Sequence, residues 1–162
     1  VRDSVLQVAG GLDVRVGGPT VDPKKDEASL RRSLYFTHSE NDHHRFLDVF
    51  DNAKVLECYR RQESILPQQA LAMSNSKLGL GMAPKIAAGL ENGVKLNEAE
   101  FIGRAFETIL ARPPTLAERA ECQQALAEWT KLPSGKNTDA PQRARVNLVH
   151  ALLNHNDFIS IR

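Results

Sequence analysis

Residues 97–110 read NEAEFIGRAFETIL, and this stretch predicts a helix over its whole length. Asn97 followed by Glu100 has the spacing of a capping box, in which each side chain accepts a hydrogen bond from the other residue's backbone N–H. Behind this cap, apolar residues recur every three or four positions and form one continuous stripe. Its members are Phe101, Ile102, Ala105, Phe106, Ile109 and Leu110. We therefore expect a buried helix here and a mainly helical chain.

The segments that follow carry the same signals. Arg112-Pro113-Pro114 ends the first helix, and Thr115 with Glu118 begins the next by the same capping device. That second helix is expected to turn inward Cys122, Ala125, Leu126 and Trp129. A final helix starts near Pro141, and its expected inward residues are Val146, Val149, Leu152 and Leu153. The tail after residue 157 is expected to pack back through Phe158 and Ile159.

The signals before residue 97 are more varied. Residues 2–9 have helical spacing and stop at a Gly-Gly pair, and short helices are expected at residues 42–50 and from Pro67. Val14 and Val16 alternate with polar neighbours, and the β-prone SLYFT of residues 33–37 could pair with them in a short ribbon. Residues 78–90 contain three glycines and Pro84, so an irregular or kinked segment is expected there. The sequence thus predicts a single mainly α domain over residues 1–162, an irregular assembly of about five to seven helices with a two-stranded β ribbon near the N-terminal part.

Residues 50–75, FDNAKVLECYRRQESILPQQALAMSN, place polar residues between apolar ones without a clean helical or strand period. An arginine pair can hold a carboxylate through two parallel hydrogen bonds, and amide side chains can satisfy backbone groups at turns. Such a network would either fix a buried corner between helices or bind a sugar or a carboxylate. The candidate polar cluster consists of Asp51, Arg60, Arg61, Ser64, Gln69 and Asn75.

Histidines supply the candidates for a metal site, and they are weak ones. His38, His43 and His44 lie within seven residues, but two adjacent histidines point about 100° apart on a helix. A solvated, histidine-rich turn is the favoured interpretation. The glycines match neither a dinucleotide fingerprint nor a phosphate-binding loop, and no serine sits in a nucleophile elbow. We therefore expect no cofactor, no resident metal and no catalytic residue in this chain.

The two cysteines, Cys58 and Cys122, belong to no zinc-binding or haem-attachment motif. Unpaired cysteine is often buried as a small apolar residue, and this is the expected role of both. A disulfide between them is expected only if the protein is exported.

Length, charge and hydropathy exclude several classes of function. With 162 residues and a formal net charge of +1, the chain creates no bulk field that would attract nucleic acid or an acidic membrane. It contains no run of roughly 18 apolar residues, which a membrane span would need. The opening VRDSVLQVAGG has no initiator Met and is not a signal peptide, so we expect a fragment cut from a longer polypeptide.

The chain resembles the planctomycete cytochrome-associated domain of unknown function, the fifteen-fifty-three family. The resemblance begins with RDSVLQVAGGLD (2–13), GGP (17–19) and RRSLYF (31–36), and it ends with ARPPTLAE (111–118) and HALLNHNDFISI (150–161). Between them, the motif residues fall on Phe50, Asp51, Cys58, Arg60, Arg61, Ser64, Pro67, Gln69, Ala70, Leu71 and Asn75. The common Asp-x-Pro after Phe is replaced here by Asp51-Asn52-Ala53.

The resemblance implies a C-terminal module of a larger exported bacterial protein, periplasmic or secreted, with no established activity. The expected function is therefore a non-catalytic structural or interaction module. Its partners would be other domains of the same polypeptide or an envelope protein. The alternative is a carbohydrate- or small-ligand-binding domain that completes an active site together with an N-terminal domain.

Overall fold

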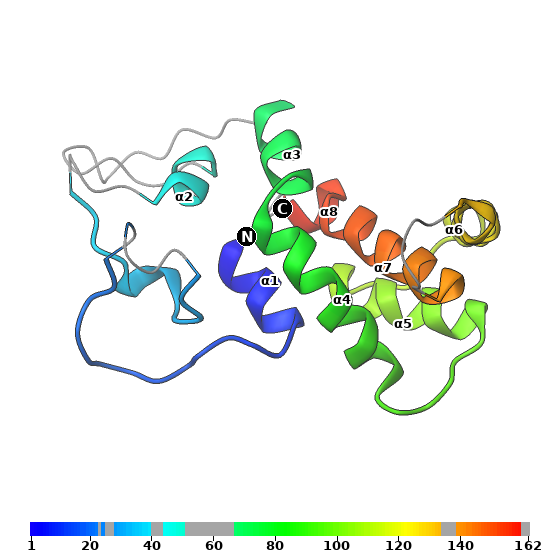
Figure 1. Ribbon diagram of the computed structural model, residues 1–162, viewed down its shortest axis with the longest axis horizontal. Coiled ribbons are helices and arrows are strands. Elements are labelled where there is room, and N and C mark those ends of the chain that lie inside the picture. Colours follow the sequence, from blue (N-terminus) through cyan, green and yellow to red (C-terminus); the bar gives the residue numbers. More distant parts are fainter. Residues whose placement is uncertain (23, 25–27, 40–43, 51–66, 134–138, 160–162) are drawn as a thin grey trace.

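The computed structural model describes residues 1–22, 24, 28–39, 44–50, 67–133 and 139–159 (Figure 1). These residues form eight α-helices and one short 3₁₀ helix, which lies between the first two α-helices at Ser33–Tyr35. The α-helices are α1 (Arg2–Val8), α2 (Arg45–Val49), α3 (Pro67–Ser74), α4 (Lys77–Glu91), α5 (Glu98–Leu110), α6 (Leu116–Lys131), α7 (Ala140–Leu153) and α8 (Asn156–Ile159). The predicted mainly helical fold is confirmed. The expected count of five to seven helices is too low.

The core lies where α4, α5 and α7 meet, and α7 contacts α3, α4, α5, α6 and α8. Helix α1 packs on α4. Figure 1 shows α1 beside α4, while residues 12–22, residues 28–39 and α2 lie apart from α5, α6 and α7. The largest fully buried side chains are Leu6, Val5, Met73, Ile86, Phe101, Ile102, Val149 and Leu153. Residues from both ends of the chain therefore share one hydrophobic core.

The two predicted capping boxes are both present. The Asn97 side chain accepts a hydrogen bond from the backbone of Glu100, whose carboxylate accepts one from the backbone of Asn97. Thr115 and Glu118 repeat this arrangement at the start of α6. All six residues of the predicted stripe on α5 are buried. Of the predicted inward residues of α6, Leu126 is buried, and Cys122 and Trp129 are partly buried against the core.

Helix α4 corrects the expectation of an irregular segment over residues 78–90. It is one uninterrupted helix in spite of Pro84, and it begins at Ser76, whose hydroxyl accepts a hydrogen bond from the N–H of Gly79. A Cβ on Gly79 would lie 3.0 Å from the carbonyl oxygen of Met73. Glycine is therefore used here for a close approach between α3 and α4, not to break the helix.

The predicted two-stranded β ribbon is wrong. Within the described residues there is no strand, and residues 33–35 form the 3₁₀ helix instead. Among the described residues, the backbones of the two segments pair only at the isolated bridges Asp13–Arg31 and Val21–Phe36. Gly17 and Gly18 have φ values of 80° and 93°, which takes the backbone between the bridges out of the extended conformation. We call residues 12–22 and 28–39 the arm.

No helix in the described part of the chain combines the length and the apolar character that a membrane crossing requires.

Candidate functional site

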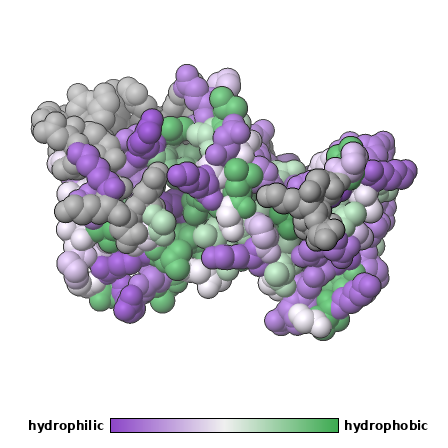
Figure 2. Space-filling model, in the orientation of Figure 1, coloured by the Kyte–Doolittle hydropathy of each residue, from purple (hydrophilic) through white to green (hydrophobic). Residues whose placement is uncertain are grey.

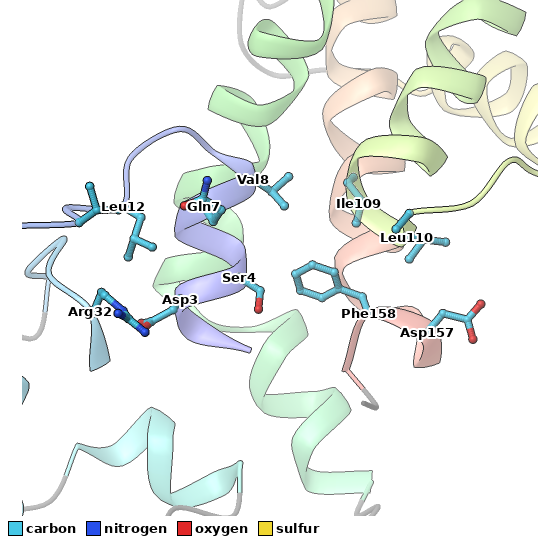
Figure 3. A pocket seen from close by; sticks show the side chains of 12 residues that line it. Asp3, Ser4, Gln7, Val8, Leu12, Arg32, Ile109, Leu110, Asp157 and Phe158 are labelled. Carbon is cyan, nitrogen blue, oxygen red and sulfur yellow. The ribbon is translucent and has the colours of Figure 1, made fainter. Parts of the chain in front are cut away.

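An open groove with a volume of about 580 Å³ runs between α1, the arm, the end of α5 and α8. Figure 3 shows its side chains, with those of α1 and the arm on one side of the view and those of α5 and α8 on the other. Ligand sites in proteins commonly have volumes of ~300–1,000 Å³. The lining residues are Asp3, Ser4, Gln7, Val8, Leu12, Val14, Arg32, Ile109, Leu110, Ala111, Asp157 and Phe158.

The wall formed by α1 and the arm is mostly polar. Asp3 accepts hydrogen bonds from the backbone N–H of Ser33, at 2.9 Å and 3.0 Å, and from the Ser33 hydroxyl at 2.5 Å. A carboxylate at this position satisfies the first N–H of the 3₁₀ helix and so fixes the arm to α1. Ser4 and Gln7 add a hydroxyl and an amide to the same wall.

Arg2, the neighbour of Asp3, holds the arm from the other side. Its side chain is only 3% exposed, and Nη1 donates to the carbonyl oxygen of Arg31 at 2.8 Å, while Nη2 donates to that of Ser29. The guanidinium lies 4.7 Å from the ring centroid of Phe36, and that ring meets the His44 ring edge-on at 4.7 Å. Two carbonyl groups, the carboxylate of Asp3 and an aromatic face engage this buried arginine, which makes it a structural anchor.

A second arginine stiffens the arm itself. Arg31 stacks over the ring of Tyr35 at 3.9 Å and donates to the carbonyl oxygens of Pro19, at 2.9 Å, and Gly17. The Tyr35 hydroxyl accepts a hydrogen bond from the N–H of Gly17 at 2.8 Å. The loop between the two bridges is therefore tied down by side chains where a sheet would have used backbone pairs.

The opposite wall is mostly apolar, and ion pairs of Arg112 hold it in place. Phe158, which packs against the core, points its ring toward α1, whereas the carboxylate of Asp157 points away from α1 (Figure 3). Arg112 donates to Asp157 Oδ2 at 2.9 Å and to both oxygens of Glu118 at 2.6 Å and 3.0 Å. This arrangement lowers the pKa of Glu118 to about 2, first through the hydrogen bonds from Arg112 and then through the backbone of Thr115. It also raises the pKa of Arg112.

Large aliphatic side chains of the arm are exposed to solvent. Val16 is 92% exposed and Val14 65%, and Leu34 and Leu30 are also exposed. Figure 2 shows hydrophobic and hydrophilic surface interspersed on the face that it presents. Single exposed apolar residues are ordinary, but four on a segment that three side-chain anchors hold in place are suited to contact with a partner.

The predicted polar cluster is only partly visible. Asp51, Arg60, Arg61 and Ser64 lie outside the described residues, so the cluster as a whole stays a prediction. Gln69 is buried on α3. Asn75 is exposed, and its amide donates to the carbonyl oxygen of Leu71 at 3.0 Å, which completes the end of α3. Satisfying a backbone group at a turn is one of the two roles expected for this amide.

The three candidate histidines are placed differently. His38 is exposed on the arm, His44 is buried against Phe36 just before α2, and His43 lies outside the described residues. Across the described ranges, no three histidine, cysteine, aspartate or glutamate side chains come close enough together to hold a metal ion.

Cys122 is half-buried against the core and forms no disulfide. Burial raises the pKa of its thiol, with Glu118 and Glu121 adding to the effect. Such a thiol is a poor nucleophile at neutral pH, in agreement with its expected structural role. Cys58 lies outside the described residues.

Sequence reasoning missed the residues that build the groove. Arg2 and Asp3 are ordinary polar positions of a short predicted helix, and Arg32 comes just before the β-prone residues 33–37. The one signal that included them was the resemblance, because they stand in RDSVLQVAGGLD and RRSLYF.

Comparison with known proteins identifies the family of the chain. The model of a family described as PSD1: Protein of unknown function (DUF1553) matches residues 1–126. The chain belongs to this family. The match includes the arm, the groove wall on α1 and the motifs up to Glu118 that carried the resemblance, whereas residues 150–161 lie beyond it. No curated protein and no solved structure matches the chain.

Proposed function

We propose that this chain is a non-catalytic scaffold and interaction module that docks through its arm and the adjoining groove. The observation that carries the proposal is an apolar arm fixed rigidly to a helical body. Val14, Val16, Leu30 and Leu34 are exposed, while Arg2, Asp3 and Arg31 hold the backbone that bears them. A preorganised apolar surface loses little conformational entropy when a partner binds.

The resemblance to an exported, multidomain bacterial protein supports a partner within the same polypeptide or in the cell envelope. A periplasmic or secreted location belongs to the same proposal. Signal-sequence processing of the complete gene product, followed by cell fractionation, tests that location: recovery of the product in the cytoplasm alone would rule it out.

Binding between separately produced pieces tests the docking function. The chain is titrated calorimetrically with the remainder of its gene product. Val16→Asp and Leu34→Asp are expected to weaken binding at least tenfold, because each places a charge in an apolar contact. Leu116→Asp is the matched control, since Leu116 is 89% exposed but lies on α6.

Equal effects of all three substitutions, or the absence of any binding, would exclude docking by the arm. Substrate turnover that is lost in a groove variant would exclude a non-catalytic role.

The groove favours a second candidate function, the binding of a carbohydrate or another small ligand to complete an active site. Its walls set a hydroxyl, an amide and a carboxylate opposite an aromatic ring, which are the groups that orient a polar ligand with apolar faces. A glycan array tests this candidate. It predicts a hit that Gln7→Ala abolishes and that Gln124→Ala, a change on exposed α6, leaves intact.

A further inference from the structure

Most charged side chains in or beside the groove are already bound to other groups of the protein. Asp3 forms an ion pair with Arg2 at 3.3 Å and accepts three hydrogen bonds from Ser33, so its charge is already compensated. Asp157 is paired with Arg112 on the far wall. Arg31 is held by carbonyl oxygens and by the ring of Tyr35.

Arg32 differs from these groups. It is exposed, it lines the groove, and within the described part of the chain no hydrogen bond or ion pair engages its guanidinium. A guanidinium presents five N–H donors in a planar fork that matches a carboxylate. Its neighbour Asp3 is already engaged by Arg2 and Ser33 and forms no ion pair with Arg32 (Figure 3). The groove therefore offers an anion a cation that no described acid pairs with.

The other lining groups narrow the class of ligand. Phe158, Ile109 and Leu110 give the groove an apolar wall, and Ser4 and Gln7 on α1 carry both donors and acceptors (Figure 3). An amide can pair with the N–H and the C=O of a peptide group at the same time. The groove is open to solvent along its length, so a chain can enter and leave it.

We infer that this groove binds an acidic peptide segment of a protein partner, with an Asp or Glu carboxylate on Arg32 and a neighbouring apolar side chain against Phe158. This inference rests on the proposed docking function and names the chemistry of its partner. Charge complementarity at Arg32 and apolar contact across the groove together supply the recognition.

Selection from a random heptapeptide display library tests the inference, and it does so even while the partner is unidentified. The wild-type chain is expected to enrich peptides with Asp or Glu beside Leu, Ile or Phe. Arg32→Glu is expected to lose that enrichment, and Arg119→Glu to retain it, because Arg119 is also an exposed arginine but lies on α6. Enrichment of peptides without an acid, an unchanged selection by Arg32→Glu, or no enrichment would each overturn the inference.

Affinity of the most enriched peptide, measured by fluorescence anisotropy, gives the size of the effect. Arg32→Ala is expected to weaken binding at least fivefold, and changing the acid of the peptide to its amide should do the same. Combining both changes should cost little more than either one, because each removes the same contact. Full additivity of the two changes would place the acid elsewhere and overturn the assignment.

Val14→Ser tests the apolar part of the site, because Val14 lines the groove yet is 65% exposed and its replacement leaves the core intact. This substitution should also weaken binding of the peptide. If Val16→Asp impairs binding to the remainder of the gene product while Arg32→Glu does not, docking by the arm stands and the acidic-peptide site is refuted.

Discussion

Arginine is the residue that organises this molecule, and four arginines do so in the same way. Arg2, Arg31, Arg112 and Arg145 each bind carbonyl or carboxylate oxygens while lying over an aromatic ring. Arg145 binds Glu91 and the carbonyl oxygen of Leu96, and its guanidinium lies over the ring of Phe101. The sequence indicated arginine networks as structural devices but pointed to Arg60 and Arg61. Charged residues are exposed in most proteins, and sequence spacing does not show which one tertiary contacts will bury.

Replacing Arg2 by Ala should release the arm. The change leaves the carbonyl groups of Ser29 and Arg31 without their donor, at a cost of about 2–4 kcal/mol in the free energy of arm opening. Hydrogen exchange should accelerate at the N–H groups of Asp13 and Val21, which bond across the arm. Arg15→Ala, which removes an exposed arginine of the same segment, should change these exchange rates little. Unaltered exchange in the Arg2 variant would refute the anchor.

Glu118 should make stability depend on pH in the acid range. Its pKa is about 2 in the folded protein against 4.5 for an unperturbed glutamate, so the folded state keeps a charge that the unfolded state loses. The stabilisation is complete above about pH 4.5 and disappears as the pH falls toward 2. At pH 6, urea unfolding should give the wild type a free energy of unfolding about 1 kcal/mol higher than that of Glu118→Gln, after allowance for solvent screening. This difference should vanish as the pH falls to 2. A difference that stays constant with pH would contradict the ion pair. Gln is the appropriate replacement because it preserves the capping box.

The helices show which sequence signals are sufficient to predict local structure without knowledge of the tertiary contacts. The capping boxes and the stripe of α5 are local patterns, and both were predicted correctly because local geometry determines them. The β ribbon failed because strand pairing depends on partners distant in sequence, and here side chains of Arg31 and Tyr35 satisfy the arm instead. Helix α4 was misjudged because its glycines were read as breakers.

Substitutions in α4 distinguish a glycine that is needed for close helix packing from glycines that face open space. Gly79→Ala places a Cβ 3.0 Å from both the Met73 carbonyl oxygen and the Ser76 hydroxyl oxygen, and should destabilise the protein by about 1–3 kcal/mol. Gly81→Ala and Gly89→Ala point into open space on the same helix and should stabilise it by about 0.5–1 kcal/mol each. Urea denaturation midpoints measure all three. Destabilisation of the same size at Gly81 would show that the close approach of α3 to α4 is not the cause.

The whole molecule is larger than the segment that the family model matches. The match ends at residue 126, within α6, yet α7 lies at the centre of the core and contributes Ala144, Leu148, Val149, Leu152 and Leu153. The hydrophobic core therefore closes only when the C-terminal helices are present. Which side chains the arm exposes could not be predicted from sequence, since the exposure of Val16 and Arg32 follows from how the arm folds back on α1.

A fragment of residues 1–132 should consequently fail to fold. It lacks the five buried residues of α7, so α4 and α5 lose the helix that they share. Circular dichroism during urea titration should show no cooperative transition for this fragment and a cooperative one for residues 1–159. A cooperative transition of the shorter fragment would mean that α7 is an appendage of an independent core.

The most direct test of docking compares hydrogen–deuterium exchange in the 162-residue chain alone and in the larger multidomain protein of which we propose it is a module. We predict slower exchange in the larger protein at residues 12–22 and 28–39, with α6 unchanged, and we expect Val16→Asp to remove the difference. Exchange in the arm that is identical in the two proteins, or protection confined to α6, would contradict docking by the arm.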